Sequence, residues 1–320
     1  MRVADLTEEQ LLGRIVPLLP AGSATLVGPG DDAAVVSAAD GRFVVTTDVL
    51  VEDRHFRRAW STGEDVGARA AVQNLADVAA MGAVPTSLVV TLAVPGDLAV
   101  SWVEGLARGL ALACAPWDVG VVGGDLSGGP VVVVGVTAHG DLEGRAPVLR
   151  SGARPGDVLA HAGVLGASAA GLALLSADLV GPGDEAAIRA YLRPGSPLAG
   201  GPAAARAGAH AMLDVSDGLL RDAGRMAAAS GVRLDVRSDA LEGDVRGVAD
   251  AAARAGVDPL DWVLGGGEDH GLLAAFPQGA ALPAPFRAIG TVHAADDESA
   301  RVTVDGAPPH VRAGWDHFAG

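Results

Sequence analysis

The spacing of hydrophobic residues changes from segment to segment along the chain, and the changes predict alternating helices and strands. Leu11, Leu12, Ile15 and Val16 recur at helical spacing after an acidic first turn. The segment RFVVTTDVLVEDRHF is rich in β-branched residues and predicts a strand that runs into polar residues. Helical patterns also cover residues 64–81, 101–114 and 167–176, and strands are predicted around SLVVTLAVP, VLAHAG, VLGGGEDHGLLAAF and RAIGTVHA.

One segment breaks this alternation. Residues 140–156 are polar and rich in turn-forming residues, and their apolar residues follow neither the helical nor the strand period. This pattern predicts a domain boundary or linker. Strands alternate with helices on both sides of it, with several direct strand-to-strand connections. We therefore expect two mixed α/β domains, residues 1–140 and 141–320. The order of the strands is not determined by periodicity.

A glycine-rich stretch in the first half has the sequence VGVVGGDLSGGPVVVVGVTAHG. It predicts a strand, a glycine loop and a second strand. In the second half, LDVSDGLL predicts a strand that ends shortly before a helix begins.

The composition narrows the classes of function. The chain has 320 residues, is 49% hydrophobic and carries a formal net charge of -16, which argues against a general nucleic-acid binder. All 23 basic side chains are arginine, so any mechanism that requires a phosphate-binding lysine is excluded. If the protein handles phosphates, arginines or divalent cations must offset the repulsion.

Neither a disulfide framework nor a membrane span is indicated. The single cysteine, Cys114, lies in a helical run and is interpreted as a small buried hydrophobic residue. The N-terminus lacks the apolar core of a signal peptide, and no run reaches the ~18 apolar residues of a membrane span. We expect a cytoplasmic protein with no membrane or nucleic-acid partner.

Carboxylates follow apolar strands or glycine turns at four places, and a fifth, Asp77, lies on a predicted helix. The four segments are Gly30-Asp31-Asp32, Thr46-Thr47-Asp48, Gly123-Gly124-Asp125 and Asp214-Val215-Ser216-Asp217-Gly218. Mg2+ takes hard oxygen ligands, commonly a few carboxylates together with phosphate oxygens and water. Carboxylates that crowd together repel one another unless a cation is present. A cluster of this kind therefore suits metal-assisted phosphoryl transfer.

Each segment taken alone has a simpler explanation. An Asp after Gly is commonly a turn residue or a helix cap, and Ser216 or Asp217 could cap the helix that follows. The pair Asp31 and Asp32 could form a hairpin turn, and Asp77 could be a solvated helix residue. Their joint occurrence is what favours a functional site.

In their order along the chain, eight motifs resemble the thiamine-monophosphate kinases, a branch of the aminoimidazole ribonucleotide synthetase-like ATP-binding enzymes. The motifs are GPGDDAAVV, TTDVLVEDRHF, NLADVAAMGAVP, GGDLSGGP, RSGARPGD, LDVSDGL, GGGEDHGLL and the terminal GWDHF. The resemblance implies an N-terminal mixed α/β domain that dimerises through its sheet into a barrel, followed by a C-terminal α/β domain, with ATP in the cleft between domains.

The implied reaction is direct transfer of the γ-phosphoryl group of ATP to thiamine monophosphate, assisted by several Mg2+ ions and giving thiamine diphosphate, the last step of its biosynthesis. The chain has no Walker A loop, as is expected of this group. The attacking phosphate oxygen is already anionic at neutral pH, so no general base is required and no proton-transfer residue is assigned.

The resemblance also assigns residues. Metal ligation falls on Asp32, Thr46, Thr47, Asp48, Asp77, Asp125, Asp214 and Asp217, with Asp31 the less favoured of its pair. ATP contact falls on Gly124, Asp125, Arg150 and Ser216, and thiamine monophosphate contact falls on His55, Glu268 and Trp315.

These assignments make chemical sense, and each has an alternative. Arg150 can place its guanidinium fork on phosphate oxygens, or it can be an exposed linker residue. Trp315 offers a flat face to a thiazolium cation, or it closes a core. His55 could be a core histidine. Glu268 could be a loop charge, or it could pair with the amino group or a ring nitrogen of the pyrimidine.

Two departures from the family pattern lie near the predicted thiamine site. His270 and Gly271 stand where a tyrosine and an acidic residue are common, and Glu52, Asp53 and Arg54 make the segment before His55 unusually charged. Both departures bear on the fit of the substrate and leave the ATP and metal residues untouched.

Other functions remain open at this point. Aminoimidazole ribonucleotide synthetase, selenophosphate synthetase and a hydrogenase maturation protein share the ATP and metal site. The hydrogenase maturation protein ends in a catalytic cysteine, whereas this chain ends in His317-Phe318-Ala319-Gly320, and Cys114 is wrongly placed for a selenophosphate synthetase. A non-catalytic Mg-nucleotide sensor is the alternative from a different class, and it would bind ATP without turnover.

Overall fold

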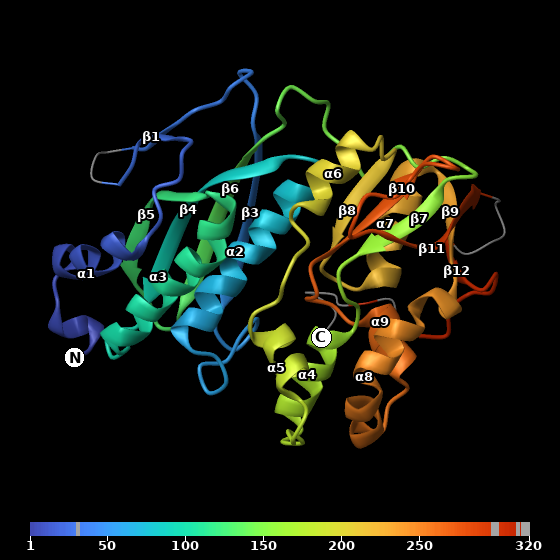
Figure 1. The fold of residues 1–320 in the computed structure, drawn as a ribbon. Coiled ribbons are helices and arrows are strands. Elements are labelled where there is room, and N and C mark those ends of the chain that lie inside the picture. The colour runs from blue at the N-terminus through green and yellow to red at the C-terminus, as the bar shows by residue number, and fades with distance from the viewer. Residues whose placement is uncertain (30–32, 296–300, 312–313, 315–320) are drawn as a thin grey trace. The chain divides into compact units, whose positions relative to one another are not determined.

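The structure is a computed structural model, and it describes residues 1–29, 33–295, 301–311 and 314. It divides into two compact units. Unit 1 is Met1–Val78 with Ala83–Gly144, and unit 2 is Ala79–Gly82 with Arg145–Gly320. Both units combine helices with a β-sheet, as the alternating pattern predicted (Figure 1).

Unit 1 is built around a four-stranded sheet. Its helices and strands are α1 (Glu8–Ile15), β1 (Thr25–Val27), β2 (Val35–Val36), β3 (Val44–Val51), α2 (Gly63–Ala80), β4 (Val84–Val94), α3 (Val100–Cys114), β5 (Gly120–Gly128) and β6 (Val133–Asp141). The order in the sheet is β3-β6-β4-β5, with β4 parallel to β5 and the other pairs antiparallel. The strands β1 and β2 form a separate antiparallel pair.

The two faces of this sheet differ in burial. Along β6, every second residue is buried, among them Val134, Val136 and Ala138. The helices α2 and α3 cover one face of the sheet (Figure 1). The other face carries exposed apolar side chains on β3, because Val45 and Val49 are 55% and 48% exposed. Phe43, 58% exposed, lies just before β3 and contacts the His139 ring at a centroid distance of 5.6 Å.

The helices α2 and α3 cross at very short range because glycines line their contact. A Cβ on Gly67 would lie 2.1 Å from the carbonyl oxygen of Leu106, and one on Gly109 would lie 2.1 Å from that of Glu64. Any side chain at these positions would therefore force the backbones apart. The contact fixes α2, the helix that carries Asp77, against its neighbour.

Unit 2 contains a six-stranded sheet covered by helices. Its helices and strands are β7 (Val158–Ala162), α4 (Ala167–Ser176), α5 (Glu185–Leu192), α6 (Gly200–Arg206), β8 (Ala211–Val215), α7 (Leu219–Ser230), β9 (Val232–Val236), α8 (Glu242–Ala255), α9 (Pro259–Gly265), β10 (Gly271–Phe276), β11 (Arg287–Ala294) and β12 (Val302–Val304). The strand order is β12-β9-β11-β7-β10-β8, and all pairs are antiparallel except β12 with β9.

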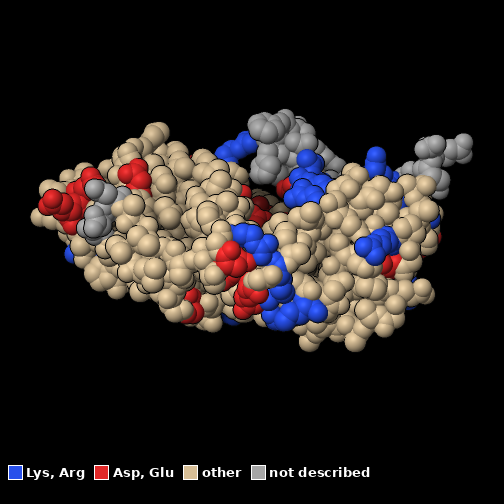
Figure 2. Space-filling model, turned by 90° about the horizontal axis from the view of Figure 1, so that it is seen from above, with Lys and Arg blue, Asp and Glu red and all other residues tan. Residues whose placement is uncertain are grey.

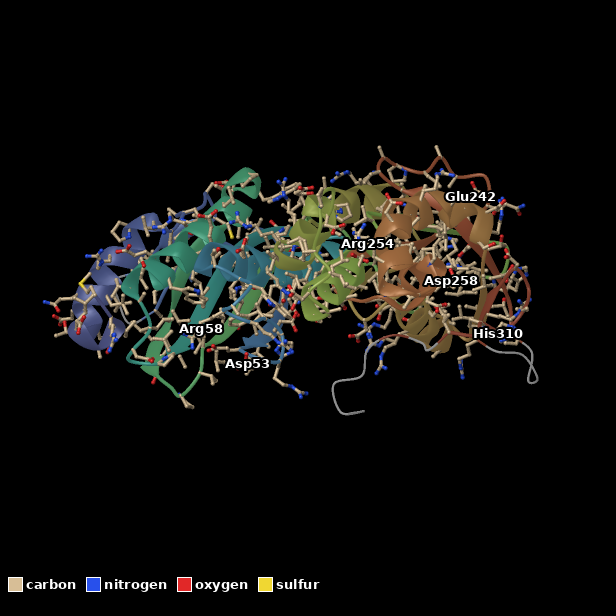
Figure 3. The ribbon with its side chains drawn as sticks, turned by 90° about the horizontal axis from the view of Figure 1, so that it is seen from below. Asp53, Arg58, Glu242, Arg254, Asp258 and His310 are labelled. Atoms are coloured by element: carbon tan, nitrogen blue, oxygen red, sulfur yellow. The ribbon has the colours of Figure 1, made fainter. Side chains whose placement is uncertain are left out.

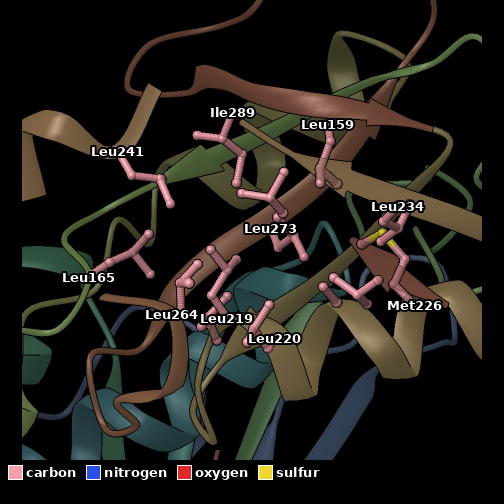
Figure 4. Close-up of a cluster of buried hydrophobic side chains, with 14 of the residues drawn as sticks. Leu159, Leu165, Leu219, Leu220, Met226, Leu234, Leu241, Leu264, Leu273 and Ile289 are labelled. Atoms are coloured by element: carbon pink, nitrogen blue, oxygen red, sulfur yellow. The ribbon is translucent and has the colours of Figure 1, made fainter. Parts of the chain in front are cut away.

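Both faces of this sheet are buried. A large cluster that includes Leu159, Leu213 and Leu273 packs against residues of α4, α7, α8 and α9 (Figure 4). A smaller cluster on the alternate residues includes Met212, Leu272 and Phe276. All six residues of β10 are buried, as expected of a central strand covered on both sides.

Two details of the sequence prediction were wrong. The motif Gly123-Gly124-Asp125 lies inside β5 and not in a glycine loop. The reason is close packing, since a Cβ on Gly124 would lie 1.9 Å from the carbonyl oxygen of Val90 on β4. Asp48 likewise lies within β3 and does not follow its end.

No helix in the described residues is long and apolar enough to cross a bilayer. On the face shown in Figure 2, arginine and carboxylate side chains lie beside each other in small groups over the described residues. Cys114 is buried, and burial raises the pKa of its thiol to about 12. It behaves as the small apolar residue that the sequence predicted.

Candidate active site

In unit 1 the structure brings Thr46 and Asp77 together. Thr46 on β3 donates its hydroxyl hydrogen to Oδ2 of Asp77 on α2, at 2.8 Å. The pair lies on the helix-covered face of the sheet, and both residues are half-buried. Asp77 is therefore not a solvated helix residue, and its carboxylate points at the strand that carries the other predicted ligands.

Thr47 and Asp48 follow on the same strand and alternate between the two faces. Thr47 donates to the carbonyl oxygen of Val136 and accepts from the Thr137 hydroxyl, at 2.9 and 3.2 Å. Asp48 lies two residues from Thr46, so both belong to the same face, and Asp48 is exposed. Thr46, Asp48 and Asp77 thus offer three oxygen-bearing side chains on one side of β3.

Gly124 and Asp125 lie at the opposite edge of the sheet. They belong to β5, which is three strands away from β3 in the order β3-β6-β4-β5, a separation of roughly 14 Å at ordinary strand spacing. Within unit 1, Asp125 is therefore not beside Asp48. Both β5 residues line a cavity of about 1010 Å³.

This cavity is mainly apolar. It lies within unit 1 and is lined by α1, α3, β4, β5, the end of β6 and the segments around β2 and before β3, among them Phe43 and His139. Leu12, Val16 and Leu106 contribute apolar side chains, and Asp125 contributes a carboxylate. Its size and its mixture of many apolar groups with a few polar ones are typical of a small-molecule site.

His55 lies in a tight turn that follows β3. Its Nδ1 accepts a hydrogen bond from the backbone N–H of Val51 at 3.0 Å. The neighbouring Glu52 is buried, accepts from the Val132 N–H and pairs with Arg58, which is labelled in Figure 3. The charged segment before His55 is therefore partly structural, because Glu52 ties the turn to the sheet.

In unit 2 two loops that carry predicted site residues lie side by side at one end of the sheet. The strand β8 ends, and β10 begins, at this end, with Leu272 paired to Asp214. The N–H of Glu268 donates to the carbonyl oxygen of Ser216 at 2.7 Å. The structure thus places a residue assigned to thiamine monophosphate directly beside one assigned to ATP.

The alternative explanation of Ser216 and Asp217 as helix caps is wrong. The N-cap of α7 is Gly218, which has no side chain that could cap the helix. Asp217 uses its carboxylate differently, because it accepts from Nη2 of Arg225 at 2.6 Å and has Nε of Arg221 at 3.7 Å.

Asp222 supports this turn from inside α7. Its carboxylate accepts from the backbone N–H of Asp217 at 2.9 Å and from Nη1 of Arg225 at 2.5 Å. Burial, reinforced by the charge of Asp214, raises the pKa of Asp222 to about 7. Arg225 therefore joins two carboxylates and offsets much of the negative charge around the turn.

Arg150 is not near Ser216 within unit 2. It is exposed, and its carbonyl oxygen accepts from the Ser230 hydroxyl at the end of α7. The N–H of Met212, near the start of β8, donates to the carbonyl oxygen of the adjacent Leu149. Arg150 therefore lies beside the start of β8, and about five residues of extended chain along β8, roughly 16 Å, separate it from Ser216.

His270, one of the departures from the family pattern, lies between predicted site residues. It is buried, its Nε2 is 3.8 Å from Oε2 of Glu268, and its Nδ1 is 4.0 Å from Oδ2 of Asp214. Gly271 is the first residue of β10. Arg54 is exposed in the turn that holds His55.

Two predicted residues, Asp32 and Trp315, lie outside the described residues, as does Asp31. In the part of the chain that the structure describes, no three His, Cys, Asp or Glu residues are grouped closely enough to hold a metal ion. The predicted ligands instead form two smaller sets, one around Thr46 and Asp77 and one around Asp214 and Asp217.

Three residues around the site were not identified from the sequence: Asp222, Arg225 and Asp269. Asp222 and Arg225 resemble ordinary charges on an amphipathic helix, and only the fold shows that they hold the turn at Asp217. Asp269 follows Glu268 directly, which was the one available signal. It is buried, and burial raises the pKa of its carboxyl to about 7.

Comparison with known protein families covers most of the chain. Residues 30–142 match the N-terminal domain of AIR synthase related proteins, and residues 154–302 match the C-terminal domain. The hydrogenase maturation protein HypE shares the fold with a TM-score of 0.70, but at 19% identity that likeness shows the fold alone.

Individual relatives are more similar. A thiamine-monophosphate kinase of Mycobacterium tuberculosis is 48% identical over 315 residues, which cover 98% of this chain and 92% of that protein. The corresponding kinase of Corynebacterium glutamicum is 43% identical and covers 90% of this chain and 88% of its own length. A solved structure of AaThiL complexed with AMPPCP and TMP is 33% identical, covers 99% of both chains and has a TM-score of 0.79. These similarities confirm the two-domain fold predicted from the motifs, and the chain belongs to the thiamine-monophosphate kinase family of AIR synthase related proteins.

Proposed function

We propose that this protein is an ATP-dependent kinase that converts thiamine monophosphate to thiamine diphosphate. The kinases of Mycobacterium tuberculosis and Corynebacterium glutamicum carry this name and align over nearly the whole chain. The AaThiL structure holds AMPPCP, an analogue of ATP, together with TMP. The proposal therefore has support from both sequence and fold.

The observation that carries the proposal is the hydrogen bond from the Glu268 N–H to the Ser216 carbonyl oxygen. It fixes the loop assigned to the acceptor against the loop assigned to ATP. A transfer between two bound phosphates requires this kind of proximity, since phosphoryl-transfer enzymes act largely by positioning and by stabilising charge.

In the proposed reaction an oxygen of the thiamine monophosphate phosphate forms a bond to the γ-phosphorus of ATP. The bond from that phosphorus to the β–γ bridging oxygen breaks, and ADP leaves with the electron pair. The attacking oxygen needs no deprotonation, which agrees with the lack of an assigned base. We propose that Glu268 orients the acceptor and that the Asp214–Gly218 turn contacts the phosphates.

The side chains around Thr46 fit Mg2+. Thr46, Asp48 and Asp77 present carboxylate and hydroxyl oxygens on one side of β3, which is the hard donor set that this ion takes, with phosphate and water completing its shell. Bound there, Mg2+ would supply charge stabilisation for the phosphates of ATP. Asp214 and Asp217 offer a second, smaller set, in which Arg225 already neutralises part of the charge.

We further propose that the base and ribose of ATP occupy the cavity of about 1010 Å³ in unit 1. Its apolar lining suits a heteroaromatic base, and Gly124 and Asp125, both assigned to ATP, form part of its wall.

The chain is proposed to form a homodimer through the open face of the four-stranded sheet. Phe43, Val45 and Val49 leave apolar surface exposed on the β3 side, and such a surface commonly marks an interface.

The direct test is a kinase assay. Purified protein with ATP and Mg2+ should convert thiamine monophosphate to the diphosphate, with one ADP formed for each product molecule, while thiamine itself should not be phosphorylated. Binding of ATP without turnover at any Mg2+ concentration would favour a nucleotide sensor and would refute the proposed reaction.

The dimer has its own test. Val49→Arg places a charge in the proposed interface and should shift the protein from dimer to monomer in analytical ultracentrifugation. Val180→Arg, at a position in unit 2 that is 52% exposed, serves as the control and should leave the dimer intact. A wild-type monomer, or a Val49→Arg dimer of unchanged affinity, would exclude this interface.

A further inference from the structure

Two carboxylates from distant parts of unit 2, a buried one and a half-buried one, hold the turn that leads from β7 into α4. The N–H of Leu165 donates to Oδ1 of Asp244 on α8 at 3.2 Å. The N–H of Gly166 donates to Oδ2 of Asp269 at 2.5 Å, and that of Ser168 donates to Oδ1 of the same carboxylate at 2.8 Å. Both oxygens of Asp269 are thus used by main-chain donors.

The helix cannot cap itself at this end. Its N-cap residue is Gly166, which has no side chain to accept from the free N–H groups of the first turn. Asp269 takes that role from another segment, and its negative charge lies at the positive end of the helix. Asp269 as a whole is only 3% exposed, and the two contacts between N–H groups and its carboxylate oxygens define where the carboxylate lies.

The loop that Asp269 holds has an unusual backbone. Glu268 has φ 70° and His270 has φ 50°, so the residues on both sides of Asp269 adopt left-handed conformations that side chains normally avoid. Such conformations persist only where surrounding contacts impose them. Hydrogen bonds at two points anchor this loop. The Asp269 carboxylate accepts from the N–H of Gly166 at the start of α4. The N–H of Glu268 donates to the carbonyl oxygen of Ser216.

We propose that Asp269 is a positioning residue for the thiamine monophosphate site, because its hold on the start of α4 fixes the left-handed turn that presents Glu268. The inference rests on the proposed function, in which Glu268 contacts the acceptor. Asp269 itself does not touch the substrate. It acts through the backbone of the residue before it.

If Asp269 only stabilised the fold, its removal would not affect the acceptor site more than the removal of another carboxylate at the same turn. Asp244 provides the matched control. Asp244 is half-buried, binds the same turn and pairs with Arg287, but it lies on α8, more than twenty residues away from Glu268 in the sequence. Removing either carboxylate weakens the start of α4. Only the removal of Asp269 should disturb the acceptor site.

The test compares Asp269→Asn with Asp244→Asn. An asparagine has one acceptor oxygen and would set its NH2 group against one of the two N–H donors. We expect Asp269→Asn to raise the KM for thiamine monophosphate about tenfold, the scale of one lost charge-assisted hydrogen bond, with the KM for ATP nearly unchanged. Asp244→Asn should lower the Tm and leave both KM values nearly unchanged. Equal KM changes in the two variants, or none in Asp269→Asn, would overturn the proposal.

A second pair of variants covers the case in which Asp269→Asn does not fold. Ser168→Pro removes one N–H that Asp269 accepts, at a first-turn position where proline is tolerated. Ser168→Ala keeps the N–H and removes only the hydroxyl. The proline variant should raise the KM for thiamine monophosphate relative to the alanine variant, and indistinguishable values would contradict the anchor.

Failure of the proposed function is recognised separately. Wild-type protein that forms no thiamine diphosphate would refute the reaction, whatever the variants do. Amide hydrogen exchange then tests independently whether Asp269 holds the Glu268 loop. The amides of residues 266–271 should exchange faster in Asp269→Asn than in Asp244→Asn. Equal exchange in the two variants would refute the role of Asp269.

Discussion

The two units hold the carboxylates proposed to serve the site in different ways. In unit 1, Thr46, Asp48 and Asp77 lie on a strand and a helix, and Asp77 is bonded to a neutral hydroxyl. In unit 2, Asp217 and Asp269 lie on loops, and their carboxylates are taken by a guanidinium group and by main-chain N–H groups. The first set lies on regular elements on one side of β3, whereas the second is held in loops by donors of the protein, which offset part of the cost of burial.

Because of this difference, removing a carboxylate should have different consequences in the two units. Where the protein already balances a carboxylate, its removal or neutralisation should alter the free energy of unfolding. Where the carboxylate is proposed to serve a bound cation, the same change should alter turnover and leave the fold largely intact.

The largest effect is expected at Asp77. Asp77→Asn should lower kcat about 1000-fold or more, because a ligand for the cation that stabilises phosphate charge is lost. The free energy of unfolding should change by less than about 1 kcal/mol, since the amide oxygen can still accept from Thr46. Steady-state kinetics and urea denaturation measure the two quantities, with Thr46→Ser as the control that keeps the hydroxyl. An active Asp77→Asn variant would remove Asp77 from the site.

The pH dependence of stability should show the opposite behaviour at Asp269. Burial raises its pKa to about 7 in the folded protein, so between about pH 4 and 7 the folded state binds more protons than the unfolded state. The wild type should therefore lose stability as pH rises through this window, by up to about 4 kcal/mol relative to Asp269→Asn. Urea denaturation of both proteins at several pH values gives the difference, and parallel curves would contradict the assigned pKa.

Arg225 tests whether the charge balance in unit 2 belongs to the fold. Arg225→Met leaves buried Asp222 without its guanidinium partner and should destabilise the protein by about 2 kcal/mol, below the cost of a fully buried pair because the Arg225 side chain is 40% exposed. Adding Asp222→Asn should recover part of the loss. Arg246→Met breaks an exposed pair with Glu242 and should change stability by less than about 0.5 kcal/mol. Equal losses of stability in Arg225→Met and Arg246→Met would show that the Arg225 ion pairs contribute no more to the fold than an exposed pair does.

The smallest effect is expected at the Glu268 side chain, which we propose contacts thiamine monophosphate, while the backbone N–H that holds the loop is unchanged by a substitution. Glu268→Gln should raise the KM for thiamine monophosphate about tenfold through the loss of one charged hydrogen bond. The Tm should stay within about 2 °C of the wild type, because the side chain is 36% exposed. An unchanged KM would show that thiamine monophosphate does not contact the Glu268 side chain.

The regular elements could be predicted from the sequence because their periods are long and unbroken. The helices α2, α3 and α4 lie within a residue or two of the predicted segments, and β3, β7 and β11 fall where β-branched or apolar runs end at turn residues. The strand order could not be predicted, since it depends on which strands bury the same face, and periodicity carries no such information.

The errors at the site have physical causes. Glycines beside Asp125 suggested a loop, but Gly124 is needed where β5 approaches the backbone of β4. Ser216 and Asp217 have the residue types of helix caps, yet Gly218 takes the cap position. Asp269 could not be distinguished from any loop aspartate, because its partners, Gly166 and Ser168, lie about a hundred residues earlier in the chain.

The glycine-lined contact between α2 and α3 also bears on motion. With backbone against backbone at Gly67 and Gly109, the two helices cannot slide or rotate past each other without a collision. Rearrangements that accompany the binding of substrates should therefore occur elsewhere, in the turns around His55, Gly218 and Glu268. In relaxation measurements on the microsecond to millisecond scale, the amides of α2 should stay silent while those of the turns show exchange. Asp77 would then serve as a fixed reference point against which the moving parts of the site are aligned.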